Sequence, residues 1–164
     1  MKTAACALLL LLVLGRAAWA EADPRVLQAL GWLVGTWETE EISYSAEGQP
    51  QEPTRGKGVF SWILGDHFLF EEYSSPAFRG RGYTQWNPDS RSYRSWWFDD
   101  SGAAEVYEAT WDGVGPRVLL SRSDQGASRE TYTRVSDTEF TYLLELDTGE
   151  GFQKVMEIRA RKVK

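Results

Sequence analysis

The chain has very little cysteine and histidine. Among its 164 residues there is one cysteine, Cys6, and one histidine, His67. Without the segment that carries Cys6, the chain forms no disulfide, no thiolate metal site and no cysteine nucleophile. A zinc site takes three or four ligands, usually histidine or cysteine, which one histidine does not supply. We therefore expect no metal, and we assign no catalytic residue.

Recognised catalytic and nucleotide-binding motifs are also missing. No Gly-x-Ser-x-Gly elbow occurs, and Gly56-Lys57-Gly58 opens a predicted strand instead of the helix that a phosphate loop needs. Asp99-Asp100-Ser101-Gly102 lacks the spaced oxygen ligands and terminal glutamate of a calcium loop, and a β-turn explains it. We expect no cofactor.

The charge has an acidic excess. Asp and Glu number 24 against 18 Lys and Arg, which gives a net charge of −6. Loss of residues 1–20 would remove Lys2 and Arg16 and no acid, and would move the net charge to −8. Phosphates and anionic membrane surfaces attract basic faces. We therefore expect neither nucleic acid nor a membrane as a partner of the mature chain.

The first 20 residues have the pattern of a secretory signal peptide. Lys2 supplies a positive start, residues 7–14 are apolar, and Ala18-Trp19-Ala20 is a small-x-small cleavage site. The apolar run is shorter than the roughly 20 residues that span a bilayer. An uncleaved anchor helix is the alternative. We predict cleavage after Ala20, one domain over residues 21–164, and a periplasmic or secreted location.

After residue 35 the pattern is that of strands and turns. Alternating apolar residues such as Phe140, Tyr142 and Leu144 indicate strands, and turn signals such as Gly65-Asp66 separate them at the spacing of an all-β fold. The ten predicted strands are Thr36–Tyr44, Gly56–Leu64, His67–Ser75, Arg79–Trp86, Ser92–Asp99, Ala104–Trp111, Arg117–Ser123, Ser128–Val135, Glu139–Asp147 and Phe152–Lys162. Short hairpins imply antiparallel neighbours, and a long twisted meander tends to close. We therefore predict a roughly ten-stranded antiparallel meander barrel.

One helical pattern precedes the strands. Asp23 suits an N-cap, Pro24 suits the first helical position, and Val26 and Leu30 are spaced along one helix face. We expect this short N-terminal helix, Pro24–Val34, to plug one end of the barrel.

Gly35-Thr36-Trp37, placed after that helix and at the first strand, resembles the Gly-x-Trp signature of the calycin superfamily. In lipocalin-like barrels this tryptophan closes one end and packs under an arginine of the last strand. The resemblance implies a structural role for Gly35 and Trp37, with Arg159 or Arg161 as the cation–π partner.

A wider resemblance covers essentially the whole chain after residue 20. The segments Ile63–Tyr73, Gly82-Tyr83 and Trp97–Gly102 are similar to the DUF1579 family of bacterial proteins. The resemblance implies a calycin-like barrel related in shape to fatty-acid-binding and nitrobindin-type folds. It implies no activity, because the family has no settled one. Nitrobindin-type haem binding uses a histidine late in the chain, whereas His67 is early and is expected at the barrel rim.

The candidate ligand-binding residues come from two strands. Glu71 and Glu72 point to opposite faces, and we place Glu72 inward with Phe70, two residues before it. The strand Ser92–Asp99 has one face that is both aromatic and polar, which suits a ligand cavity. The predicted ligand-binding residues are Phe70, Glu72, Tyr93, Trp97 and Asp99.

Three functions are compatible with these residues. We favour a non-enzymatic carrier or binder of a small apolar or amphipathic ligand. An enzyme that uses an inward carboxylate such as Glu72 as acid or base is the second, and a ligand-free structural or interaction domain is the third. If Arg129, Thr131 and Thr133 satisfy Glu72, the site is structural. The interior volume separates these readings, because a cavity favours the carrier and a filled interior favours the structural domain.

Overall fold

The computed structural model describes residues 23–109, 117–123 and 126–163. The expected signal peptide and its cleavage site after Ala20 lie outside these ranges. In the described part, helix α1, Pro24–Leu30, runs into a 3₁₀ turn at Gly31–Leu33 and is followed by ten strands. The strands are β1 (Gly35–Ser43), β2 (Thr54–Ile63), β3 (Phe68–Ser74), β4 (Arg79–Asn87), β5 (Ser92–Asp99), β6 (Ala104–Ala109), β7 (Arg117–Ser123), β8 (Gly126–Ser136), β9 (Glu139–Asp147) and β10 (Phe152–Lys162).

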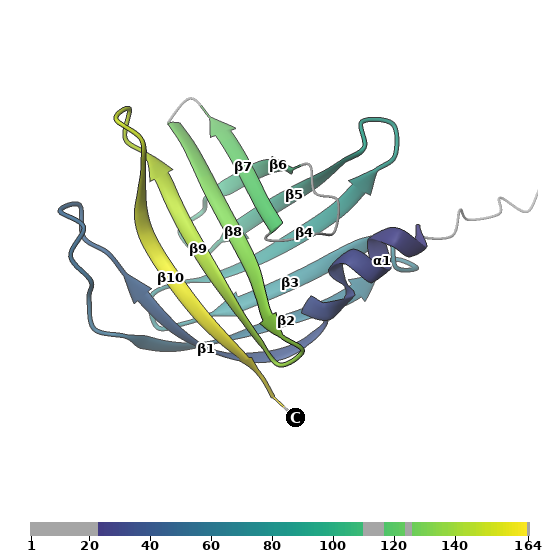
Figure 1. The fold of residues 1–164 in the computed structure, drawn as a ribbon, viewed down its shortest axis with the longest axis horizontal. Coiled ribbons are helices and arrows are strands. Elements are labelled where there is room, and N and C mark those ends of the chain that lie inside the picture. Colours follow the sequence, from purple (N-terminus) through teal and green to yellow (C-terminus); the bar gives the residue numbers. More distant parts are fainter. Residues whose placement is uncertain (1–22, 110–116, 124–125, 164) are drawn as a thin grey trace, which may run out of the picture.

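The sheet is an antiparallel meander that closes on itself (Figure 1). Each strand pairs with its neighbours in the chain, and β1 also pairs with β10, from Trp37 opposite Lys162 to Ser43 opposite Met156. Between β6 and β7, the described residues pair over a much shorter stretch, Tyr107 opposite Ser121 and Glu108 opposite Leu120. The all-β antiparallel barrel predicted from the turn signals is therefore confirmed.

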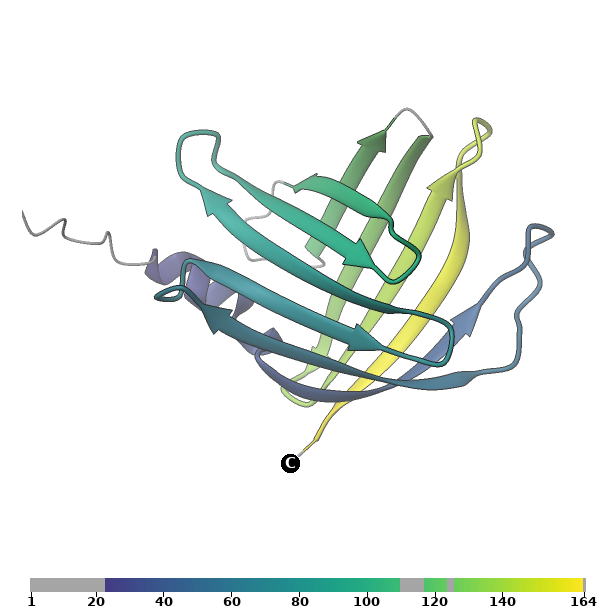
Figure 2. The same cartoon turned by 180° about the vertical axis from the view of Figure 1, so that it is seen from behind.

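Helix α1 lies at one end of the barrel and fills it (Figures 1 and 2). Leu30 and Leu33 are completely buried and pack in one apolar cluster with Phe60, Leu69 and Phe140 from the strands. The α-helix is shorter than the expected Pro24–Val34, because the chain tightens into the 3₁₀ turn at a glycine, a weak helix former. Neither helical segment among the described residues is long and apolar enough to cross a bilayer.

Trp37 joins the helix to the barrel floor. Its indole Nε1 donates a hydrogen bond of 2.7 Å to the carbonyl oxygen of Leu33, and its ring meets Phe140 edge-on at 4.7 Å between centroids. The Lys162 ammonium lies 5.1 Å from the Trp37 ring centroid. The φ of Gly35 is +139°, a conformation that residues with a side chain rarely adopt, so glycine is favoured there.

The prediction that Arg159 or Arg161 is the cation–π partner of Trp37 is wrong, because Lys162 takes that position. Arg159 lies on the outer surface, where it forms an ion pair with Glu139. The two-residue period of β10 explains the error: Ile158 and Ala160 are buried inside the barrel, so the arginine between them faces out. Lys162 continues the inward row and takes the position over Trp37.

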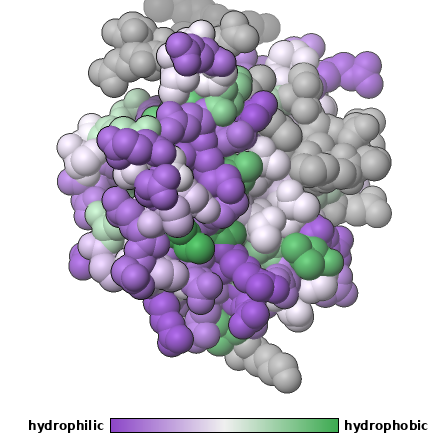
Figure 3. Space-filling model, turned by 60° about the vertical axis from the view of Figure 1, so that its left-hand side comes forward, coloured by the Kyte–Doolittle hydropathy of each residue, from purple (hydrophilic) through white to green (hydrophobic). Residues whose placement is uncertain are grey.

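One face of the barrel is largely polar, with isolated hydrophobic side chains (Figure 3). Cross-strand ion pairs follow the outer rows, as between Arg94 and Glu108 on β5 and β6. Exposed pairs of this kind contribute only about 0–1 kcal/mol each to stability. The fold is therefore held mainly by its interior, where the candidate site also lies.

Candidate functional site

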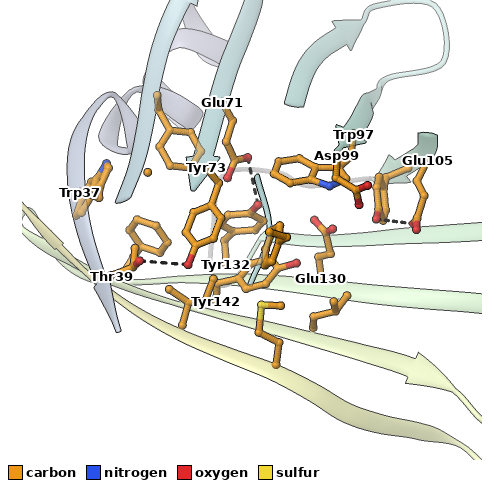
Figure 4. A pocket seen from close by; sticks show the side chains of 18 residues that line it. Trp37, Thr39, Glu71, Tyr73, Trp97, Asp99, Glu105, Glu130, Tyr132 and Tyr142 are labelled. Atoms are coloured by element: carbon orange, nitrogen blue, oxygen red, sulfur yellow. Dashed lines mark hydrogen bonds between the residues drawn. The ribbon is translucent and has the colours of Figure 1, made fainter. Parts of the chain in front are cut away.

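The barrel encloses a cavity of about 230 Å³. This equals the liquid volume of roughly eight waters and lies just below the roughly 300–1,000 Å³ of typical ligand pockets. Side chains from eight strands line it above the floor formed by Trp37 (Figure 4). The lining residues are Trp37, Thr39, Gly58, Phe60, Glu71, Tyr73, Phe78, Trp97, Asp99, Glu105, Tyr107, Glu130, Tyr132, Phe140, Tyr142, Leu144, Met156 and Ile158.

Trp97 on β5 forms a flat wall of this cavity. Its indole lies against the backbone of β4: a Cβ on Gly80 would stand 2.1 Å from Trp97 Cζ2, and one on Gly82 would stand 3.2 Å from Cε3. A Cβ at residue 80 does not fit unless the ring moves, and one at residue 82 would crowd it, so the two glycines allow the ring to lie flat on the sheet. Phe78 contacts the ring edge-on, with 6.5 Å between centroids. The ring thus has a fixed position and lines the cavity (Figure 4).

Four carboxylates line the cavity from four different strands. They belong to Glu71, Asp99, Glu105 and Glu130. Figure 4 shows these groups on the side of the cavity where Trp97 lies. Among the residues whose side chains the structure describes, no lysine, arginine or histidine lines the cavity. The described lining is therefore both aromatic and anionic.

Tyrosine hydroxyls donate hydrogen bonds to these carboxylates. Tyr107 donates to Glu105 at 2.6 Å, and Tyr132 approaches Glu71 at 3.4 Å. Burial, and then the charge of Glu130, raises the pKa of Tyr107. The same two causes, in the same order, raise the pKa of Tyr142. These phenols consequently stay protonated and act as neutral donors.

Asp99 is held by the turn that follows β5. Its Oδ1 accepts hydrogen bonds from the Ser101 hydroxyl, and from the backbone N–H groups of Ser101 at 2.9 Å and Ala103 at 3.2 Å. The Ser101 hydroxyl is the main cause that lowers the pKa of Asp99. Asp99 is therefore an ionised carboxylate in a fixed position at the rim of the cavity.

A second polar chain lies deeper, beside the floor. The Tyr73 hydroxyl donates to Glu41 Oε2 at 2.7 Å, and the Thr39 hydroxyl lies 3.2 Å from the same phenol oxygen. Glu41 is 1% exposed, so this phenol is an important donor to a buried carboxylate. A Cβ at residue 56 would come within 2.6 Å of the Tyr73 oxygen, so Gly56 leaves room for the hydroxyl.

The predicted ligand-binding residues divide into three groups. Trp97 and Asp99 line the cavity as predicted. Tyr93 faces inward but packs in the core against Trp86, at 4.8 Å between centroids, and does not line the cavity. Phe70 and Glu72 face the outside of the barrel, so their assignment to the interior is wrong.

The alternation of β3 explains that correction. Leu69 and Tyr73 are buried, which places Glu71 inside with them and Glu72 outside. Glu72 pairs with Arg81 at 2.9 Å on the surface, and the two side chains are 47% and 64% exposed. The neighbouring outward residue, Phe70, packs on Tyr83 of β4.

Arg129 differs from the internal role considered for it, whereas His67, expected at the barrel rim, lies outside the cavity. Arg129, considered as an internal partner of Glu72, instead pairs with Glu145 at 2.7 Å and stacks over Phe152. His67 lies in the turn between β2 and β3 and is not among the lining residues of the cavity. In the described residues no cluster of three or more His, Cys, Asp or Glu side chains is arranged to hold a metal ion.

Comparisons with known proteins place the chain by its fold. Neither a family model nor a curated protein sequence matches it. The S-type phycobiliprotein lyase CPES from Guillardia theta superposes with a TM-score of 0.58 at 13% identity, over 87% of this chain and 98% of that one. The redesigned β-barrel mFAP1, solved with DFHBI bound, gives a TM-score of 0.43 at 16% identity, over 82% and 99% of the chains. The similarity to the lyase shows a shared fold, and the resemblance to DUF1579 stays a prediction.

Proposed function

We propose that this protein is a non-enzymatic binder of a small amphipathic molecule, held inside the barrel. The observation that carries the proposal is the cavity of about 230 Å³, walled by aromatic rings and edged by a few fixed polar groups. Ligand sites in proteins have this combination, in which apolar walls supply affinity and placed polar groups supply orientation. The calycin-like character suggested by the sequence belongs to the same proposal.

An acid–base enzyme is less well supported by the same residues. The described polar residues that line the cavity are carboxylates, tyrosines and Thr39, with no histidine, cysteine or lysine among them. General acids work best when their pKa lies near the working pH. The pKa values of Tyr73 and Tyr107 are raised by burial, away from neutrality. Binding without chemistry accounts for the described groups with fewer assumptions.

The place of action is also a proposal. The signal-like pattern of residues 1–20, with its cleavage site after Ala20, favours export to the periplasm or beyond. The N-terminal sequence of the protein recovered from outside the cytoplasm tests this. Glu21 as the first residue supports export, and Met1 retained in a membrane fraction contradicts it.

Two neighbouring tryptophans provide a matched test of the binding site. Trp97 lines the cavity, whereas Trp96 lies on the outer face against Phe68. Native mass spectrometry of the purified protein should show a bound small molecule. Trp97→Leu should lose that species, and Trp96→Leu should keep it. Melting curves of both variants show whether each is folded.

A native mass spectrum of the wild-type protein without a bound molecule does not by itself contradict the binding function, because a weakly bound ligand is lost during purification. Intrinsic fluorescence is then titrated with a panel of fatty acids, quinones, aromatic amines and porphyrins. Saturable quenching in wild type and Trp96→Leu, with none in Trp97→Leu, supports the binder. No response to any member of the panel contradicts it.

A further inference from the structure

The open part of the cavity has a distinct group of residues around one ring. Trp97 and Glu105 are directly opposite on β5 and β6, and Asp99 follows Trp97 on the same face of β5. Directly opposed residues in an antiparallel pair have side chains about 5 Å apart at Cβ. Two carboxylates therefore lie on one side of the indole, with Glu130 of β8 also turned into this space (Figure 4).

Asp99 and Glu105 are charged groups whose described partners are neutral. Asp99 uses Oδ1 for the turn, and no other interaction involves its Oδ2 among the described contacts. Glu105 accepts its hydrogen bond from the phenol of Tyr107. Neutral donors orient a carboxylate without cancelling its charge, so the negative potential at this ring is retained.

The Trp97 ring is suited to a cation as well as to an apolar group. Its position against Gly80 and Gly82 is fixed by close contact with the β4 backbone. The face of an indole attracts cations, and the attraction grows when water is excluded. A ring of this kind beside carboxylates favours a positive group over a neutral one, and strongly disfavours an anion.

We propose that the ligand of this cavity is an organic cation, a protonated amine on a flat apolar body. The apolar body stacks on Trp97, and the ammonium group lies between Asp99 and Glu105. This inference rests on the proposed binding function and names its ligand class. It stands on the fixed ring and the cavity as well as on the acidic side chains.

Three probes with one ring system and three charges test the inference. They are 1-naphthylmethylamine, 1-naphthylmethanol and 1-naphthoate, titrated into the protein by calorimetry at pH 7 and low salt. The amine should bind about tenfold or more tightly than the alcohol, which corresponds to about 1.4 kcal/mol, and the carboxylate should bind most weakly. The preference for the amine should shrink as salt is raised.

Two glutamates of β6 supply the matched control. Glu105→Gln should remove most of the preference for the amine over the alcohol. Glu108→Gln, on the outer face of the same strand and paired with Arg94, should leave both affinities unchanged. Trp97→Phe keeps an aromatic wall and should weaken both probes, which tests the ring without relying on a variant that fails to fold.

The outcomes separate this inference from the function on which it rests. If the amine and the alcohol bind equally well, and Trp97→Leu loses both, the cationic ligand class is wrong but the binding function of the cavity is supported. Tighter binding of the carboxylate overturns it as well. If none of the three probes binds, the proposal of a cationic ligand is overturned. The co-purified species in the native mass spectrum then decides the binding function separately.

Discussion

The Trp97 indole lies so close to Gly80 that a methyl group cannot be added between them. A Cβ at residue 80 would stand 2.1 Å from Trp97 Cζ2, which is well inside van der Waals contact. Because the ring and the backbone of β4 fit together in this way, the glycine sets the shape of the cavity. A residue without a side chain thus determines where one wall of the cavity lies.

Gly80→Ala should therefore displace Trp97 and destabilise the protein. Overpacking of a fitted site costs about 1–3 kcal/mol, and the displaced ring should also change the tryptophan emission spectrum. Gly31→Ala is the control, since a Cβ there meets no atom within 4 Å and φ is not positive. A Gly80→Ala protein with wild-type melting temperature and emission would contradict the close fit.

Substitutions at the barrel floor should have graded effects. Trp37→Ala should cost roughly 3–5 kcal/mol, as for other large core residues. Lys162→Ala should cost about 0.5–1 kcal/mol for the cation–π contact. Arg159→Ala should be close to neutral, because its ion pair with Glu139 is at the surface. Urea denaturation measures all three, and a larger loss for Arg159 than for Lys162 would restore the arginine as the partner of Trp37.

Adjacent glutamates should differ in their effect on binding. Glu71→Gln removes a negative charge from the cavity lining. It should weaken the binding of the naphthyl amine several fold, which corresponds to about 1 kcal/mol or less. Glu72→Gln removes only an exposed pair with Arg81 and should leave that affinity unchanged. Calorimetry of the two variants makes the comparison. The reverse pattern would mean that β3 presents its other face to the interior.

The tyrosines should make the protein sensitive to alkali. Burial raises the pKa of Tyr73, Tyr107 and Tyr142 above the usual value of 10.0. Above pH 10 the unfolded chain loses these phenolic protons while the folded chain keeps them. The unfolded state then binds fewer protons, so the free energy of unfolding falls as pH rises.

Ultraviolet absorbance near 295 nm follows this ionisation. The buried tyrosines should ionise late in the titration, in one cooperative step that coincides with loss of the β-sheet signal in circular dichroism. Tyr73→Phe should reduce the amplitude of that late step. A single smooth titration of all tyrosines in the folded protein would show that these phenols are accessible.

Turn signals in the sequence predicted the strands closely. Glu139–Asp147 and Phe152–Lys162, for example, have the predicted bounds, because glycine and aspartate turns leave little freedom in where a short hairpin reverses. The closed end was also predictable, since Trp37 follows a helix and begins the first strand. Both features depend on local chemistry that the sequence displays directly.

The inward faces were harder to predict, and β3 shows why. Its outer row carries Phe70, and its inner row carries Glu71, so hydrophobicity alone assigns the strand the wrong way round. Pairing resolves the choice: Gly82 is opposite Glu71 on one side and Trp97 on the other, so these three residues share one face. An inward Trp97 therefore implies an inward Glu71. The acids on β6 and β8 follow only when that register is carried around the barrel.

The pairing of β1 with β10 has a consequence for how the protein is made. Every other strand pair joins neighbours in the chain, but β1 pairs with β10, so Trp37 is opposite Lys162, which is 125 residues later in the sequence. During synthesis the first strand has an unpaired edge until the last strand emerges, and such edges invite association with other chains. A chain cut short before β10 should therefore aggregate, even though its other nine strands are intact.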